Sequence, residues 1–180
     1  MARLKERYKK IAVPALIKEF GYKNHLSVPR VTKAVINVGI SAKNNDPKFF
    51  ETAESSLRRI TGQKPVRTLA KKSISNFKIR KNMTVGMMVT LRGERLYSFL
   101  EKLINVTLAR VRDFRGLSPK SVDSRGNLTI GFREHVAFPE IRSDEVERVH
   151  GLEVTVVTNA CSREESLALL KQLGFPFIKN

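Results

Sequence analysis

Hydrophobic and polar residues alternate with a period of two in several stretches of the chain, which predicts β-strands. In the stretch RVTKAVINVGI, Ile36 and Val38 lie on one face and Asn37 lies on the other. Clear strands are predicted over residues 30–40, 83–92 and 152–159, and shorter ones over residues 65–69 and 127–132.

Apolar residues at helical spacing, bounded by capping residues, predict helices between these strands. Asp46 and Pro47 form the expected start of one helix, which Gly62 ends. A capping box at Ser162 and Glu165 starts another. Two further helices are predicted over residues 94–108 and 3–19, the second with a kink or a break at Pro14.

The predicted elements favour one fold class. Each clear strand has one apolar face and one more polar face, so helices should cover only one side of the sheet. The order strand, helix, two strands, helix, two strands, helix favours an α+β fold over a doubly wound parallel sheet. We therefore expect a two-layer sandwich with a mostly antiparallel sheet, in a single domain over residues 1–180.

Positive charge is concentrated in the first half of the chain. The sequence has 34 Lys and Arg against 17 Asp and Glu, a net charge of +17. Residues 1–93 hold 21 cations and 5 acids, a net of +16, whereas residues 94–180 hold 13 and 12, a net of +1. This one-sided charge is typical of a surface that binds nucleic acid. An ordinary solvated face, the alternative, would interleave both signs.

The polar face of the predicted sheet combines cations with amide and hydroxyl groups, on Lys33, Asn37, Thr84, Thr90 and Arg92. Cations suit phosphates, and amides and hydroxyls suit finer contacts, so we expect this face to be open to RNA. Asn is depleted in strands, which makes Asn37 unusual among its Val and Ile neighbours. A solvated strand residue, the alternative, is the better interpretation for Thr84.

Residues 70–82 form a long connection between two predicted strands and contain five cations around Phe77. Connections of this length inside a domain are uncommon unless they are functional or disordered. An aromatic ring among cations can stack on the bases of RNA. The alternative is a hairpin whose Phe77 packs back onto the core.

The sequence contains no recognisable catalytic or metal-binding motif. His25, His135 and His150 are scattered, and Cys161 has no second cysteine to pair with. We therefore expect no enzyme, no metal site, no cofactor and no small-molecule substrate, and we expect Cys161 to be a small buried filler. The apolar run Ile11–Ile17 is too short to span a membrane and lacks a cleavage site, so a soluble cytoplasmic protein is expected.

Four long segments together cover most of the chain: PALIKEFGYKNHLSVPRVTKAVINVGI, ITGQKPVRTLAKKSISNFKIRKNMTVGMMVTLRGERLYSFLEKLIN, RVRDFRGLSPKSVDSRGNLTIGFREHVAFPEI and GLEVTVVTNA. In order and spacing they closely resemble the bacterial large-subunit ribosomal protein five family. The resemblance implies a structural constituent of the 50S subunit that binds 5S rRNA in the central protuberance. It also implies contacts with adjacent 23S rRNA and with other 5S-binding large-subunit proteins.

The same resemblance assigns a set of 5S contacts. Three residues match the family's motifs directly, in INVG, TGQKP and VTLRG, and three cations on the same face or in the same segments are placed with them. The expected 5S rRNA-binding set is Asn37, Gln63, Thr90, Lys33, Lys64 and Arg92.

Two further contact regions are implied by the resemblance. The basic connection is similar to the family segment that reaches P-site tRNA, which implies contacts from Lys71, Lys72, Ser75, Asn76, Phe77, Lys78 and Arg80. Two other segments resemble those that face small-subunit protein thirteen across an intersubunit bridge, which implies contacts from Arg110, Arg112, Arg115, Ser143 and Asp144.

Two other classes of protein stay open at this point. A generic RNA-coating protein would show no preference for 5S rRNA. A protein-interaction module would bind its partners in a way that survives high salt, because few phosphate contacts would be involved.

Overall fold

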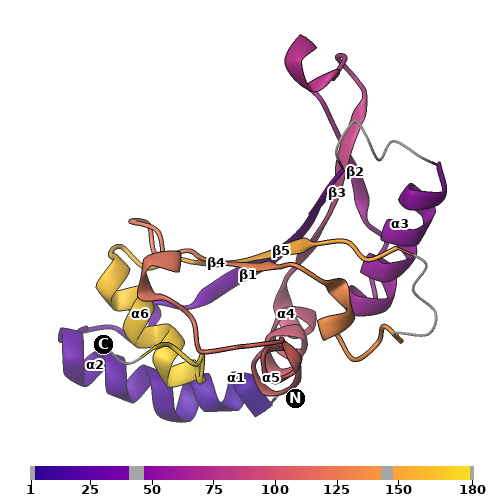
Figure 1. Ribbon diagram of the computed structural model, residues 1–180. Coiled ribbons are helices and arrows are strands. Elements are labelled where there is room, and N and C mark those ends of the chain that lie inside the picture. Colours follow the sequence, from indigo (N-terminus) through magenta and orange to yellow (C-terminus); the bar gives the residue numbers. More distant parts are fainter. Residues whose placement is uncertain (1–2, 41–46, 143–147, 179–180) are drawn as a thin grey trace. The chain divides into compact units, whose positions relative to one another are not determined.

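The computed structural model describes residues 3–40, 47–142 and 148–178 (Figure 1). In chain order the elements are α1 (Arg3–Arg7), η1 (Tyr8–Ala12), α2 (Val13–Phe20), η2 (His25–Ser27), β1 (Val31–Gly39), α3 (Pro47–Thr61), β2 (Val66–Leu69), η4 (Ser75–Phe77), β3 (Thr84–Leu91), α4 (Gly93–Lys102), η5 (Leu103–Thr107), α5 (Leu108–Arg110), η6 (Pro119–Ser121), β4 (Leu128–Phe132), η7 (His135–Ala137), β5 (Leu152–Thr158) and α6 (Arg163–Leu173). The predicted alternation of strands and longer helices is confirmed.

The strands form one sheet in the order β2-β3-β1-β5-β4. β2 pairs antiparallel with β3. β1 and β5 also run antiparallel, because the Asn159 N–H donates to the Arg30 carbonyl at 3.1 Å while the Thr32 hydroxyl donates to the Val157 carbonyl at 3.0 Å. The expected α+β class with a mostly antiparallel sheet is therefore confirmed.

The described chain divides into two compact units. Of the described residues, unit 1 comprises 3–34, 91–130 and 155–178, and unit 2 comprises 35–40, 47–90, 131–142 and 148–154. β1, β3, β4 and β5 each begin in one unit and end in the other. The expectation of a single domain over residues 1–180 stays a prediction.

In unit 1, the N-terminal helix continues past Pro14 without a break. α1, η1 and α2 follow one another directly, and Val13, before the proline, keeps helical angles. The widened turn of η1 precedes Pro14, and such a π-helical segment can accommodate the missing N–H and the bulk of the proline ring. The helix ends at Gly21, whose φ of 70° is left-handed.

The start of α6 in unit 1 has the predicted cap with one difference. The Ser162 hydroxyl accepts the Glu165 N–H at 3.2 Å, as expected. The Glu165 carboxylate, however, accepts the Cys161 N–H at 2.9 Å instead of that of Ser162. Cys161 itself is exposed, so the expectation of a buried filler was wrong.

The SRGN segment of unit 1 forms a tight turn against α6. Gly126 has a φ of 78°, and its carbonyl accepts the hydroxyls of Ser166 at 2.6 Å and Thr158 at 2.8 Å. A Cβ at this position would lie 2.9 Å from the Ser166 Cβ, which is too close. Only glycine allows both the turn and the contact.

Unit 2 has its own apolar core. The inward faces of β1 and β3 bury Ile36, Val38, Met87 and Val89, as the alternation predicts. α3 begins at Pro47, and it buries Phe49, Ala53, Leu57 and Ile60. The predicted N-cap, Asp46, lies outside the described residues.

Candidate nucleic-acid interface

The outward face of β1, β3 and β2 in unit 2, called here the open face, is where Asn37 and Thr90 lie. The Ile40 N–H donates to the Val85 carbonyl at 2.9 Å, and Gly86 lies against Val38 and Gly39. β3 therefore runs opposite to β1. Counting along both strands from this bond places Asn37 beside Met88 and Thr90 beside Val35, on the same face.

A row of three side chains crosses the open face. Val66 on β2 is directly opposite Met88 on β3, and Met88 is in turn beside Asn37. Val66 is 62% exposed and Met88 is 38% exposed, whereas Asn37 is half-buried. The amide of Asn37 thus borders an exposed apolar strip, an arrangement that can hold a base by its flat face and by its edge.

Gly86 lets the strands approach closely in the next row. A Cβ at Gly86 would lie 2.7 Å from the Val38 carbonyl oxygen and 3.0 Å from the Thr68 hydroxyl, and backbone cannot move aside cheaply. The signal in the sequence was a glycine within a strand pattern, which often marks a close approach of backbone. The expected contact set left out Gly86, Val66 and Met88, because it contained only polar and charged residues.

Gln63 and Lys64 follow α3 directly in unit 2. Gly62 ends the helix with a φ of 66°. The Thr61 hydroxyl donates to the Leu57 carbonyl at 2.6 Å and accepts the Gln63 N–H at 3.2 Å. This cap fixes the backbone of Gln63, whose side chain is half-buried, while Lys64 is exposed.

The six expected 5S contacts do not all lie in one unit. Asn37, Gln63, Lys64 and Thr90 belong to unit 2. Lys33, which is half-buried, and Arg92, which is exposed, belong to unit 1.

Arg67, the one charged residue of β2, lies on the side of the sheet away from the open face. Arg67 is opposite Met87, whose side chain is buried, so Arg67 is on the side away from the open face. There its guanidinium lies 3.7 Å from the Glu54 carboxylate of α3. The open face of β1, β2 and β3 in unit 2 carries no acidic residue.

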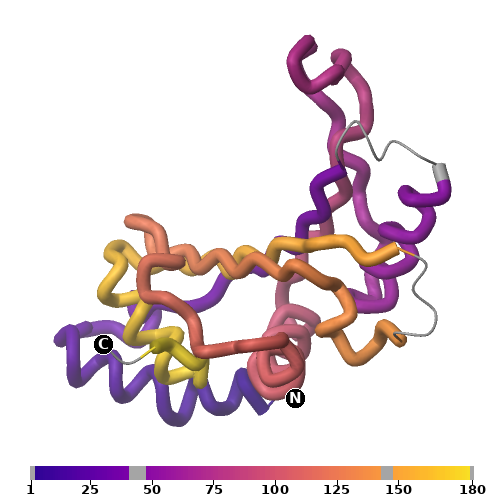
Figure 2. Tube along the Cα trace, in the orientation of Figure 1, coloured from indigo at the N-terminus to yellow at the C-terminus, as the bar shows by residue number. Residues whose placement is uncertain are grey.

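Residues 70–83 form an ordered extension of the β2–β3 hairpin, called here the basic hairpin. Its backbone pairs at the base, where Ala70 bonds to Met83 and accepts from Asn82, both at 2.9 Å. Near the tip, Ile74 and Ile79 exchange two bonds of 2.9 and 3.1 Å. Figure 2 traces this extension beyond the paired part of β2 and β3.

The tip of the basic hairpin exposes both its charge and its aromatic ring. Lys71, Lys72, Ser75, Asn76, Phe77, Lys78 and Arg80 are all exposed. Phe77 is 66% exposed, so the alternative that it packs back onto the core is wrong. A short 3-10 turn places it at the tip, and Lys78 follows in a left-handed conformation with a φ of 53°.

The residues expected at the intersubunit contact are only partly described. Arg110, the last residue of α5, and Arg112 and Arg115, which follow it, are exposed in unit 1. Ser143 and Asp144 lie outside the described residues.

Two histidines that looked unrelated in the sequence are stacked in unit 2. The rings of His135 and His150 are parallel within 5°, with centroids 3.9 Å apart, and both side chains are buried. The His150 N–H donates to His135 Nδ1 at 3.2 Å, and the same nitrogen lies 3.3 Å from the His150 carbonyl oxygen. Spacing along the chain gave no sign of this pair, because the pairing of the segments after β4 and before β5 brings the rings together.

Burial favours the neutral form of both histidines. It lowers the pKa of His135, and burial followed by the neighbouring His135 lowers the pKa of His150 to about 4. Within the described residues, no group of three His, Cys, Asp or Glu side chains could hold a metal ion. None of the helices in the described ranges is long and apolar enough to cross a membrane.

Comparison with known proteins gives the family. Residues 24–80 match the model of the family "Ribosomal protein L5", and residues 84–177 match the model of the C-terminus of the same ribosomal family. The chain belongs to the ribosomal protein uL5 family. Relatives named "Large ribosomal subunit protein uL5" from Halothermothrix orenii and Caldanaerobacter subterraneus subsp. tengcongensis are 55% and 54% identical. The matches cover 98% and 99% of this chain, and 99% and 100% of those relatives.

Membership in the uL5 family fixes the general role. The chain is a structural, non-enzymatic constituent of the large ribosomal subunit and takes part in translation in the cytoplasmic ribosome. The resemblance to bacterial ribosomal protein five is thereby confirmed.

Proposed function

We propose that the chain binds 5S rRNA in the central protuberance, and adjacent 23S rRNA, chiefly through the open face of unit 2. The observation that carries this proposal is the row formed by Val66, Met88 and Asn37, on a face that has no acidic residue. Exposed apolar side chains next to a strand amide suit unpaired bases, and the absence of carboxylates avoids repulsion of phosphates.

Cations supply the affinity of the chain for 5S rRNA, and the polar groups supply the discrimination. Lys64 beside Gln63 in unit 2, and Lys33 and Arg92 in unit 1, contact phosphates of the same RNA. Asn37, Gln63 and Thr90 read base edges or 2′-hydroxyls. Each such hydrogen bond matters because losing it leaves a buried RNA group unpaired.

The basic hairpin contacts P-site tRNA as a second function. The specific observation in favour is that an ordered backbone holds Phe77 exposed among five cations. Holding a large apolar ring in water is unfavourable unless a partner covers it, and the bases or riboses near a bend in RNA offer such a cover.

The exposed arginines Arg110, Arg112 and Arg115 face small-subunit protein thirteen across an intersubunit bridge, together with Ser143 and Asp144. Other 5S-binding large-subunit proteins are the remaining partners. These contacts rest on resemblance to the family and on the exposure of the arginines.

A pull-down tests the proposal. The tagged full chain is mixed with lysate from ribosome-depleted cells plus deproteinised total RNA, and the RNA that it retains is sized and sequenced. We expect 5S rRNA to be enriched over its abundance. RNA of all sizes in proportion to abundance would indicate a generic coating protein, and retention of proteins alone at high salt would indicate a protein-interaction module.

A further inference from the structure

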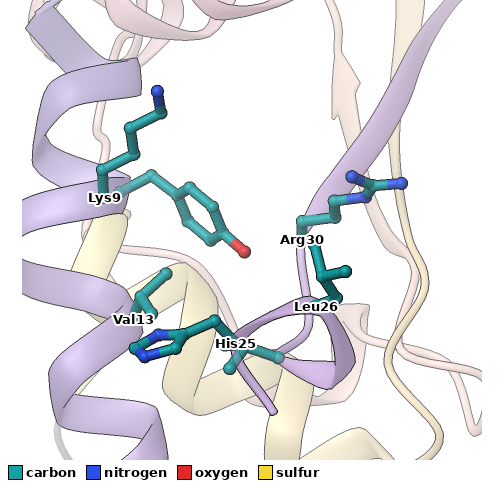
Figure 3. Close-up of a pocket in the computed structure, with 7 residues that line it drawn as sticks. Lys9, Val13, His25, Leu26 and Arg30 are labelled. Atoms are coloured by element: carbon teal, nitrogen blue, oxygen red, sulfur yellow. The ribbon is translucent and has the colours of Figure 1, made fainter.

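Unit 1 contains a hollow of about 280 Å³ that is lined by none of the residues of the open face (Figure 3). One wall is the N-terminal helix, with Tyr8, Lys9 and Val13, and the other is the segment from His25 to Arg30. The Tyr8 hydroxyl donates to the Pro29 carbonyl at 3.1 Å and so ties the two walls together. The hollow is therefore a feature of the packed structure.

The inside of the hollow is mostly apolar. Val28 is buried, and Val13 and the ring of Tyr8 are half-buried. At the rim, Leu26 is 83% exposed, which is unusual for a leucine in an ordered turn. The Asn24 side chain accepts the Leu26 N–H at 2.9 Å, so the turn that presents this leucine is fixed.

Two cations stand at the rim without acidic partners. Within the part of the chain that the structure describes, neither Lys9 nor Arg30 forms an ion pair with an Asp or Glu side chain. Burial, with a smaller effect of Tyr97, raises the pKa of Tyr8, and the Arg30 guanidinium opposes that rise.

The size of the hollow selects a small occupant. A volume of about 280 Å³ is just below the lower end of small-molecule pockets, roughly 300 Å³. It has room for one ring system attached to a larger molecule. Cations without acidic partners at the rim favour an occupant whose attached chain is anionic close to the ring, and a nucleotide meets both conditions.

We propose that this hollow binds one unpaired nucleotide of ribosomal RNA. The base lies against Tyr8 and Leu26, and the flanking phosphates lie against Lys9 and Arg30. The inference rests on the proposed function, because it takes ribosomal RNA as the partner. The excess of +16 in residues 1–93 favours RNA over an acidic peptide of a neighbouring protein.

Photo-crosslinking from the rim tests the occupant directly. p-Benzoyl-phenylalanine replaces Leu26 in the full chain, and large subunits that contain this chain are irradiated. Ile11 is the matched control. It is 51% exposed on η1, the segment that also carries Tyr8 and Lys9, and it does not line the hollow. We expect a cross-link from position 26 to one nucleotide, absent from position 11. A cross-link from position 26 to protein alone, or none, would overturn the proposal.

Chemical probing of the RNA gives the second arm. Leu26→Asn, and the double variant Lys9→Glu and Arg30→Glu, should remove the protection of the cross-linked nucleotide in large subunits. Ile11→Asn and Lys18→Glu, an exposed cation on α2, should leave it protected. Unchanged protection in both rim variants would contradict the inference. If the wild-type chain retains 5S rRNA in the pull-down while both of these experiments fail, only the assignment of the hollow is wrong. If the wild-type chain retains no 5S rRNA, the proposed function itself is wrong.

Discussion

The outward position of Asn37 could be predicted from its residue type, but its neighbours in the site could not. A polar amide within a Val- and Ile-rich strand predicted an outward position, and the structure places Asn37 beside Met88 on the open face. The apolar neighbours Val66 and Met88 could not be predicted as part of the site. Apolar residues in strands normally indicate the core, and only the register between β2 and β3 brings these two to the same place.

Removing the amide or the hydroxyl should weaken recognition without weakening the fold. We expect Asn37→Ala and Thr90→Ala each to reduce 5S rRNA affinity by about 1–3 kcal/mol, because an RNA group is left unpaired. Filter binding or fluorescence titration with 5S rRNA and a length-matched unrelated RNA measures this. Thr84→Ala, half-buried on the same strand, is the matched control and should change neither affinity. Equal losses on both RNAs would show that these residues support the fold instead.

His150 should make the stability of the protein depend on pH. Its pKa falls from an ordinary 6.5 to about 4 in the folded state. Folding therefore favours the neutral ring, and the stability it contributes is complete above about pH 6.5 and is lost as the pH falls toward 4. Protonation would also leave His150 Nε2, which has no partner in the described structure, with a buried unpaired N–H.

Thermal unfolding between pH 7.5 and pH 4.5 measures this effect. The wild-type chain should lose more stability than His150→Leu over this range, by an amount on the order of 3 kcal/mol when protonation is complete. His25→Gln, which removes an exposed histidine instead, is the control variant. Parallel curves for wild type and His150→Leu would mean that the ring is already solvated.

At the scale of elements, most of the fold followed from periodicity and caps. Pro47 and Ser162 mark the starts of helices, and the left-handed glycines mark their C-terminal ends. Each satisfies a backbone requirement that few residues can meet. The continuation of the helix through Pro14 was not predictable, since it depends on the widened turn of η1 and on packing of η1 and α2 against α6. The basic hairpin appeared as a loop because its pairing is interrupted by turns at Ser75–Phe77 and at Asn82.

The tip of the basic hairpin should be separable from 5S binding. Replacing Ser75–Arg80 with two glycines keeps the base, where Ala70 pairs with Met83 and Ser73 accepts the Lys81 N–H at 2.9 Å. We expect unchanged 5S affinity, because the open face stays intact. Ribosomes that carry this variant should lose P-site tRNA faster, which a dissociation time course measures.

Phe77→Ala separates stacking from charge, because it keeps every cation of the hairpin. If Phe77 stacks on tRNA, this variant should weaken the binding of P-site tRNA by about 1–3 kcal/mol. Two results would count against this account: unchanged tRNA retention after tip replacement, or loss of 5S binding from the same change.

At the scale of the whole molecule, charged and uncharged residues contribute different parts of RNA binding. The basic half of the chain attracts RNA without regard to sequence, and the uncharged residues of the open face provide the preference. The charge asymmetry is visible in the sequence, since it needs only counting. The division of the expected 5S contacts between two units is not visible in the sequence, because β1 and β3 each pass from one unit to the other.

The most direct test of specific 5S recognition is a titration of the full chain with 5S rRNA and with a length-matched unrelated RNA over a range of salt concentrations. With about five phosphates neutralised, log affinity should fall with log salt at a slope of roughly −4 for 5S rRNA. The preference for 5S rRNA should persist at every salt concentration, because uncharged contacts do not depend on counterion release. Equal affinity for both RNAs, or a slope near zero, would contradict the account.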